Sequence, residues 1–163
     1  MTATLRNLML ALVATLALLA CKKEEAAPPP PVVLTVPSDP ADLAGWKQYL
    51  TGVVKANMEG IRQRPYMYFV PAVVDEETER QYKDQLETIQ DTLGRGILPG
   101  NLIAFGSPDS NKLAELVVEA FKSSAAGSLK GVRVLVVGAS ADQERVKAAV
   151  VPSEAEFVFV EAR

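Results

Sequence analysis

Beyond the first 40 residues, segments with helical spacing of apolar residues alternate with short continuous apolar runs. In the first such segment, which includes Leu43, apolar residues recur at steps of three and four, as on one face of an α-helix. Ser38 or Asp39 is the expected N-cap, Pro40 suits the first helical position, and Gly60 marks the expected end. The pattern therefore predicts an amphipathic helix that packs one face against a core.

Four short apolar runs predict β-strands, and helical patterns separate them. The expected strands are 66–70, 102–105, 132–137 and 157–160, and the helices between them begin near 75, at 109 or 110, and at 140. Strands that alternate with helices indicate βαβ units, whose strands are parallel. The sequence therefore predicts a small three-layer α/β domain with a mostly parallel sheet of four or five strands, in an order that the pattern does not define. Ser140 and Gln143 also predict a capping box at the last helix.

The first 20 residues have a different pattern. Arg6 precedes an apolar stretch over residues 8–20, which is shorter than the roughly 20 apolar residues needed to span a bilayer. A positive segment followed by such a stretch is typical of a secretory signal peptide. The residues at its end, Leu18-Leu19-Ala20-Cys21, resemble the lipobox of bacterial lipoproteins.

This resemblance implies that Cys21 is the first residue of the processed protein. Its thiol would carry a diacylglyceryl group, and its freed amine would carry a further acyl chain of the palmitate type. Two or three buried chains, at about 0.8 kcal/mol per CH₂, hold a protein on a membrane essentially permanently. Lys22 follows Cys21 where an aspartate would signal inner-membrane retention, so the resemblance favours the outer membrane and a domain that faces the periplasm.

Residues 21–40 are expected to form a tether between the lipidated cysteine and the domain at 41–163. Six prolines lie between Lys22 and Pro40, four of them consecutive. Polyproline conformation extends about 3.1 Å per residue, which gives a semi-rigid reach of roughly 50–60 Å. The run Val32–Val36 interrupts the prolines and is either an edge strand on the domain or part of the linker.

Composition excludes several classes of function. Without residues 1–20 the chain loses Arg6 from its 17 basic residues and keeps 20 acidic ones, so its formal charge is 16 − 20 = −4. That balance argues against nucleic-acid binding, which usually needs a basic surface. The chain has no histidine and one cysteine, which excludes an internal disulfide and the usual Cys/His zinc sites. We predict no cofactor.

Two strand-to-helix junctions are candidate ligand sites. Gly106, Ser107 and Ser110 follow one predicted strand, and Gly138 and Ser140 follow another. Helix N-termini at the carboxyl ends of parallel strands bind anions through free N–H groups. Neither junction has the GxGxxG spacing or a Walker lysine, so relief of the turn by glycine and capping by serine are the favoured interpretation.

A second candidate site is the basic and aromatic segment that contains Arg62, Arg64, Tyr66 and Tyr68. Arginine and tyrosine are enriched at the centres of protein interfaces, so this segment is a candidate partner surface. The alternative is a pair of loop arginines followed by strand aromatics that face the core.

Two further groups of residues contain side chains that could bind a metal or act as a nucleophile, but their patterns do not indicate either role. The acidic residues of the helix after residue 75 alternate with Arg80 and Lys83, as on a solvated helix face, and do not indicate a metal site. These acids are Glu76, Glu77, Glu79, Asp84 and Glu87. A Ser–Lys nucleophile would need one of three loop serines beside a lysine, and nothing in the sequence positions such a pair. The residues concerned are Ser123, Ser124, Ser128, Lys122 and Lys130.

The sequence favours a non-catalytic, lipid-anchored envelope protein whose α/β domain binds a protein or a cell-wall component, as accessory or immunity lipoproteins do. Two alternatives stay open. One is a small-ligand or anion-binding lipoprotein that uses the two glycine junctions, and the other is a weak hydrolase built on carboxylates or a Ser–Lys pair.

Overall fold

The computed structural model describes residues 34–162, which form an α/β domain around a four-stranded, all-parallel sheet. This confirms the predicted fold class and supplies the strand order, which is β1-β2-β3-β4. The strands are β1 (Tyr66–Phe69), β2 (Leu102–Gly106), β3 (Arg133–Gly138) and β4 (Glu156–Glu161). Each strand pairs with the next one along the chain, with Tyr68 beside Phe105 and Phe105 beside Val136.

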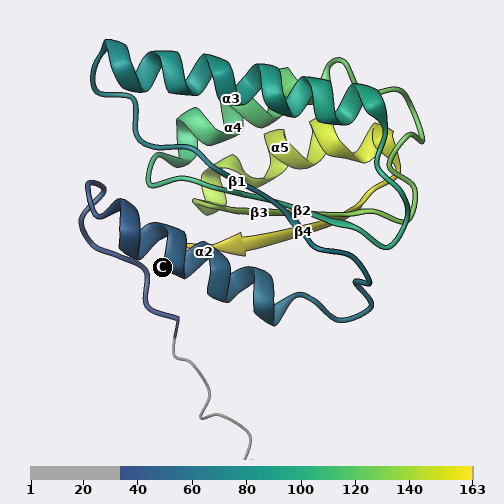
Figure 1. The fold of residues 1–163 in the computed structure, drawn as a ribbon, viewed down its shortest axis with the longest axis horizontal. Coiled ribbons are helices and arrows are strands. Elements are labelled where there is room, and N and C mark those ends of the chain that lie inside the picture. Colours follow the sequence, from purple (N-terminus) through teal and green to yellow (C-terminus); the bar gives the residue numbers. More distant parts are fainter. Residues whose placement is uncertain (1–33, 163) are drawn as a thin grey trace, which may run out of the picture. The chain divides into compact units, whose positions relative to one another are not determined.

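The helices divide unequally between the two faces of the sheet. Their bounds are α2 (Leu43–Ala56), α3 (Glu76–Arg95), α4 (Ser110–Phe121) and α5 (Gln143–Val150), with short 3₁₀ turns at Ser140–Asp142 and Val151–Ser153. Because parallel crossovers are right-handed and every step goes to the next strand in the same direction, the crossover helices α3, α4 and α5 cover one face. Helix α2 covers the other face, and Figure 1 shows these three layers.

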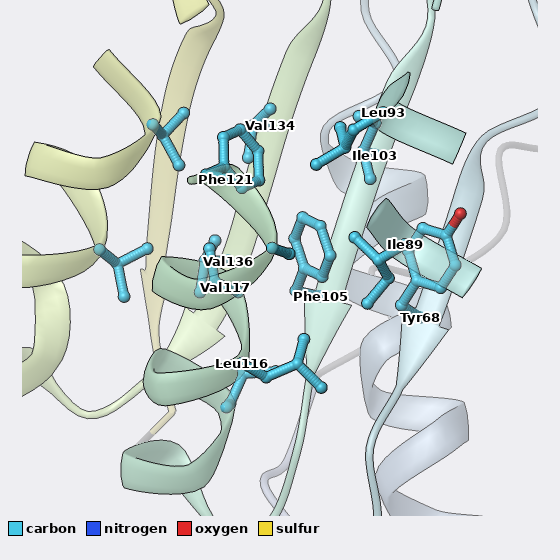
Figure 2. Packing of buried hydrophobic residues seen from close by; sticks show 14 of the residues in the cluster. Tyr68, Ile89, Leu93, Ile103, Phe105, Leu116, Val117, Phe121, Val134 and Val136 are labelled. Carbon is cyan, nitrogen blue, oxygen red and sulfur yellow. The ribbon is translucent and has the colours of Figure 1, made fainter. Parts of the chain in front are cut away.

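The larger core lies between the sheet and the three crossover helices. Phe105 at its centre is fully buried, stacks on Tyr68 at 5.6 Å between ring centroids, and meets Phe121 edge-on at 6.3 Å. Figure 2 shows Ile89 of α3 beside the Phe105 ring, and Leu93 of α3 and Val117 of α4 in the same cluster. Burial of aromatic and branched side chains on this scale is the main stabilising contribution to the domain.

A smaller core lies between the sheet and α2. Trp46, Leu50 and Val53 of α2 pack onto the face of β2 and β3 that points away from the crossover helices. Leu34 and Val36 pack against the same cluster. The space for Leu34 comes from Gly52, since a Cβ at that position would lie 2.1 Å from the Leu34 Cδ2 atom. Residues 34–36 are not in a strand, so this part of the Val32–Val36 run is a docked linker, while residues 32 and 33 lie outside the described residues.

Helix boundaries depart from the sequence predictions at three places. Helix α2 ends at Ala56 and not near Gly60, and the side chain of Asn57, directly after the helix, donates a hydrogen bond to the Val53 carbonyl oxygen. Helix α2 begins three residues after Pro40, because the Asp42 carboxylate accepts a hydrogen bond from the Gly45 N–H and provides the N-cap. The predicted capping box at Ser140 is wrong, since this residue lies in the 3₁₀ turn and its side chain makes no cap bond. Helix α3 has a capping box instead, formed by Asp75 and Thr78.

Arg133, at the start of β3, connects the end of α2 to the amino end of the sheet through hydrogen bonds. Its Nη1 atom donates to the carbonyl oxygens of Asn57 at 2.6 Å and Glu59 at 2.9 Å, and its Nη2 atom lies 3.0 Å from a carboxylate oxygen of Glu156. The positive charge of this guanidinium is also stabilised by the negative end of the α2 helix dipole.

The predicted signal peptide, the lipidation site at Cys21 and the Pro-rich tether lie outside the described residues. Among residues 34–162, the helices are too short or too polar to cross a lipid bilayer.

Candidate functional site

The two glycine junctions meet at the carboxyl ends of β2 and β3, as neighbouring parallel strands require. The Ser110 hydroxyl accepts a hydrogen bond from the Ala139 N–H at 2.7 Å and donates one to Asp142 at 2.5 Å. Asp142 also accepts a hydrogen bond from Arg145 at 2.7 Å, and Arg145 donates to the carbonyl oxygen of Asn111. The polar groups of the two junctions therefore satisfy one another.

Both glycines serve close packing at this end of the sheet. A Cβ at Gly138 would lie 2.7 Å from the Ser110 hydroxyl oxygen, and a Cβ at Gly106 would lie 2.9 Å from the Leu50 side chain. Ser107 is buried, and its hydroxyl accepts a hydrogen bond from the Asp109 N–H. Ser140 is exposed and takes no part in this network.

The strand order removes the usual reason for a ligand crevice at these ends. In open parallel sheets, ligands bind where the strand order reverses, because helices on opposite faces diverge there. The order β1-β2-β3-β4 contains no reversal, and α4 and α5 pack side by side on one face. The small-ligand hypothesis therefore gains no support from the geometry of these junctions.

The predicted partner segment divides between surface and core. Arg62 and Arg64 are exposed, and Tyr66 is 41% exposed at the start of β1. Tyr68 is 7% exposed, and its hydroxyl bonds to the Thr92 hydroxyl at 3.0 Å. The period of two along a strand puts both tyrosines on the same face of β1, so the difference comes from coverage: Tyr68 packs with Ile89 and Leu93 in the larger core. Tyr68 therefore belongs to the core and not to a partner surface, as the alternative interpretation of this segment expected.

Exposed apolar side chains gather around β1. Met67 in β1 is 39% exposed, Leu43 in α2 is 41% exposed, and Val74 in the loop after β1 is 79% exposed. With Tyr66, four of the six large apolar residues that are exposed within residues 34–162 lie on or beside this edge strand. Tyr66 and Met67 extend to opposite faces of β1, so these side chains flank the edge strand on both sides.

A groove of 340 Å³ opens beside the same strand, and we call it the β1 groove. It runs between α2 and α3, with the carboxyl end of β1 at its floor. The lining residues are Leu43, Lys47, Phe69, Pro71, Gln81, Asp84, Gln85 and Thr88. Its volume lies at the lower end of the range for ligand pockets, and its walls combine apolar, amide and hydroxyl groups.

The β1 groove carries one charge of each sign. The Lys47 ammonium lies over the Phe69 ring, 5.5 Å from the centroid, in a cation–π contact. Asp84 lines the opposite wall. Within the described part of the chain, Lys47, Arg62 and Arg64 form no ion pair, whereas most of the other cations are paired with a carboxylate. Lys55, Arg95 and Lys147 are likewise outside the ion pairs of the described residues.

The serines and lysines that could form a Ser–Lys nucleophile contact other partners. The Ser124 and Ser128 hydroxyls bond to each other at 2.9 Å, while Lys122 pairs with Glu119 and Lys130 pairs with Glu154. The described contacts thus contain no Ser–Lys pair. Among residues 34–162, no group of three or more His, Cys, Asp or Glu side chains is placed to hold a metal ion, and this includes the acids of α3.

The shifted pKa values have structural causes. Burial raises the pKa of Tyr49, and burial together with the negative charge of Glu115 raises the pKa of Tyr82. A hydrogen bond to Glu115 raises the pKa of Lys112, and hydrogen bonds from Thr78 lower the pKa of the capping carboxyl of Asp75. None of these groups belongs to a constellation suited to acid–base catalysis.

Sequence reasoning missed the β1 groove, although two of its signals are visible in the chain. Pro65 and Pro71 bracket the run Tyr66–Val70, which is typical of an edge strand. Lys47 lies on the polar side of the first amphipathic helix. What the sequence does not contain is the position of α3 relative to α2 across that edge, because it depends on the strand order.

Comparison with known proteins gave no match to a protein-family model, to a curated protein or to a solved structure.

Proposed function

We propose that this protein is a lipid-anchored protein of the bacterial cell envelope, and that its α/β domain is a non-catalytic protein-interaction module. The observation that carries the second part is the gathering of Leu43, Tyr66, Met67 and Val74 around one open sheet edge. Exposed apolar surface is kept where a partner covers it, because it otherwise promotes aggregation.

The anchor is proposed on the sequence alone. The residues Leu18-Leu19-Ala20-Cys21 are followed at once by Lys22 and Lys23, which do not enter an apolar core. Acylation of Cys21 would place the domain at a membrane surface, and Lys22 favours the outer membrane. The docking of Leu34 and Val36 on α2 supports a tether that joins the domain beside α2.

The anchor is tested by metabolic labelling of the full chain with radioactive palmitate. Wild-type protein is expected to incorporate label and to partition into the detergent phase of Triton X-114, whereas Cys21→Ser is expected to do neither. Equal partitioning of the two proteins would refute the anchor.

The interaction module is tested by affinity capture from envelope extracts. The full chain is expected to retain one protein in a fixed ratio, and a variant with Tyr66 and Met67 both changed to Lys is expected to lose it while it keeps its thermal midpoint. Retention of the same protein by both chains would refute a role for this surface.

A further inference from the structure

The outer edge of β1 offers two backbone groups of each kind to a further strand. The Val70 N–H donates to the Gly106 carbonyl oxygen at 2.9 Å, so residues 66, 68 and 70 direct their backbone groups toward β2. Because successive residues of a strand alternate in this direction, the N–H and C=O groups of Met67 and Phe69 point away from the sheet. Such an edge is a template for main-chain hydrogen bonds.

The helices on either side limit what fits against this edge. Three helices about 8–10 Å apart extend over roughly 16–20 Å, while four strands about 4.8 Å apart extend over roughly 14 Å. Helix α3 therefore projects past β1, in agreement with its four residues in the wall of the β1 groove. A single extended segment fits between α3 and α2, whereas the sheet edge of a second folded copy would bring its own helices into contact with them.

The two walls of the β1 groove differ in chemistry. Leu43 and Phe69 lie on the α2 side, and Met67 shares that face of β1. Gln81, Gln85 and Thr88 lie on the α3 side and offer amide and hydroxyl groups. A bound strand places alternate side chains on opposite faces, so it would direct apolar side chains to one wall and hydrogen-bonding side chains to the other.

Charge distinguishes the amino end of β1 from its carboxyl end. Arg62 and Arg64 precede the strand, are exposed, and are outside every ion pair in the described part of the chain. At the carboxyl end, Lys47 and Asp84 line the groove with one charge of each sign, and Asp75 and Glu76 follow the strand at the start of α3. A segment that lies along this edge would therefore place acidic residues beside the two arginines.

We propose that the β1 groove binds an extended segment of a partner protein by strand addition to β1. The segment alternates apolar with hydroxyl or amide side chains and carries acidic residues at the end that lies beside Arg64. This inference rests on the proposed function as an interaction module, and it specifies the mode and the chemistry of recognition.

The probe is a short synthetic peptide in which valine and threonine alternate, with two glutamates at one end. One version carries the glutamates at its amino end and another at its carboxyl end, because the segment can run in either direction. A control peptide carries lysines in their place. Binding to the full chain in detergent micelles is measured by fluorescence anisotropy. One glutamate peptide is expected to bind about tenfold more tightly than the lysine peptide. The proposal would be overturned if the glutamate and lysine peptides bound with equal affinity, or if no peptide bound.

Site-resolved amide exchange tests the strand addition itself. The exchange of the Met67 and Phe69 amides is expected to slow about tenfold or more with peptide, while the Tyr68 amide, which faces β2, changes less. Binding without slower exchange at Met67 and Phe69 would refute strand addition. Slow exchange at both amides without peptide, together with a dimer in sedimentation, would also refute it and would identify a second copy as the occupant.

Substitutions separate the edge from its charges. Met67→Pro removes an outward N–H that is not needed for pairing with β2, and proline is tolerated on edge strands, so loss of peptide binding with an intact fold is expected. Arg64→Glu is expected to reverse the preference between the glutamate and lysine peptides. Lys147→Glu on α5 is the matched control, and it should leave both affinities unchanged.

The same variants distinguish failure of this inference from failure of the proposed function. If Met67→Pro and Arg64→Glu still capture the envelope partner as wild type does, the interaction module stands and strand addition is wrong. If the peptides bind as expected and the chain captures no envelope protein, the binding mode stands and the proposed function fails.

Discussion

A parallel sheet exposes polar groups at the carboxyl ends of its strands and along its outer edges. In this domain the groups at the carboxyl ends of β2 and β3 differ from those at the outer edge of β1 in how they are paired. At the carboxyl ends, Ser110, Asp142 and Arg145 satisfy one another and the adjacent backbone. At the β1 edge, the outward groups of Met67 and Phe69 face a groove with exposed apolar side chains beside it. In this sheet, whose strand order has no reversal, the polar groups at the carboxyl ends of β2 and β3 are paired with one another, whereas the outer edge of β1 has no neighbouring strand among the described residues.

The largest expected effect comes from the two tyrosines of β1, which test where the open edge stops and the core begins. Tyr68→Ala removes a ring stacked on Phe105 and the hydroxyl bonded to Thr92, and should cost about 3–5 kcal/mol of unfolding free energy. Tyr66→Ala, on the exposed part of the same strand, should cost less than about 1 kcal/mol. Chemical denaturation measures both, and similar losses would contradict the division between core and surface.

The two junction serines test whether the carboxyl ends are closed. Ser110→Ala leaves the Ala139 N–H without its acceptor and the Oδ2 atom of Asp142 without the Ser110 donor, and should cost about 1–3 kcal/mol. Ser140→Ala should change the unfolding free energy by less than about 0.5 kcal/mol, because that side chain is exposed. Denaturant midpoints of the two variants decide the matter. Equal midpoints would mean that the hydrogen bonds of Ser110 do not hold these ends together.

The close approach of Leu34 to α2 can be broken by one methyl group. Gly52→Ala would place a Cβ 2.1 Å from the Leu34 Cδ2 atom and should displace that side chain. The net stability should change by less than about 1 kcal/mol, because alanine favours the helix by a similar amount. Proteolysis near residues 34–38 is the informative measurement. Faster cleavage is expected, and cleavage at the wild-type rate would show that Leu34 does not hold the linker on α2.

The smallest effect concerns the N-cap of α3, the helix that forms one wall of the β1 groove. Hydrogen bonds from Thr78 lower the pKa of the Asp75 carboxyl. The stability that they contribute is therefore present above the ordinary carboxyl pKa of about 3.9 and is lost as pH falls through the lower folded value. Asp75→Asn should flatten this acid limb of the stability curve. An unchanged slope below about pH 4 would show that the cap carries no such linkage.

The sequence allowed prediction of what depends on local patterns. The buried run at 132–137 indicated a strand, the apolar stripe around Leu86 and Ile89 indicated α3, and their alternation indicated a parallel sheet. Capping was harder to predict, because Ser140 resembles an N-cap by residue type, whereas the structure places it in a 3₁₀ turn whose Asp142 bonds to Ser110 of another helix.

The candidate site was less predictable than the fold. Residue type identifies Arg62, Arg64 and Tyr66 as candidates for an exposed surface, but it leaves Tyr68 open between partner surface and core, because residues two apart share a face of the strand and only the packing of α3 decides which of them is covered. The β1 groove needs residues from α2, β1 and α3, which are brought together by the strand order. No local pattern contains that order, so the groove could not be derived from the sequence.

Site-specific photo-crosslinking tests the contrast between the open edge and the closed ends most directly. Benzoylphenylalanine is placed at Gln85 in the β1 groove or at Ser140 at the carboxyl ends, in the full chain expressed in bacterial cells, and the adducts are compared after irradiation. The account predicts a discrete protein adduct from Gln85 that an added glutamate-ended peptide abolishes, and none from Ser140. An adduct from Ser140 and none from Gln85 would contradict it.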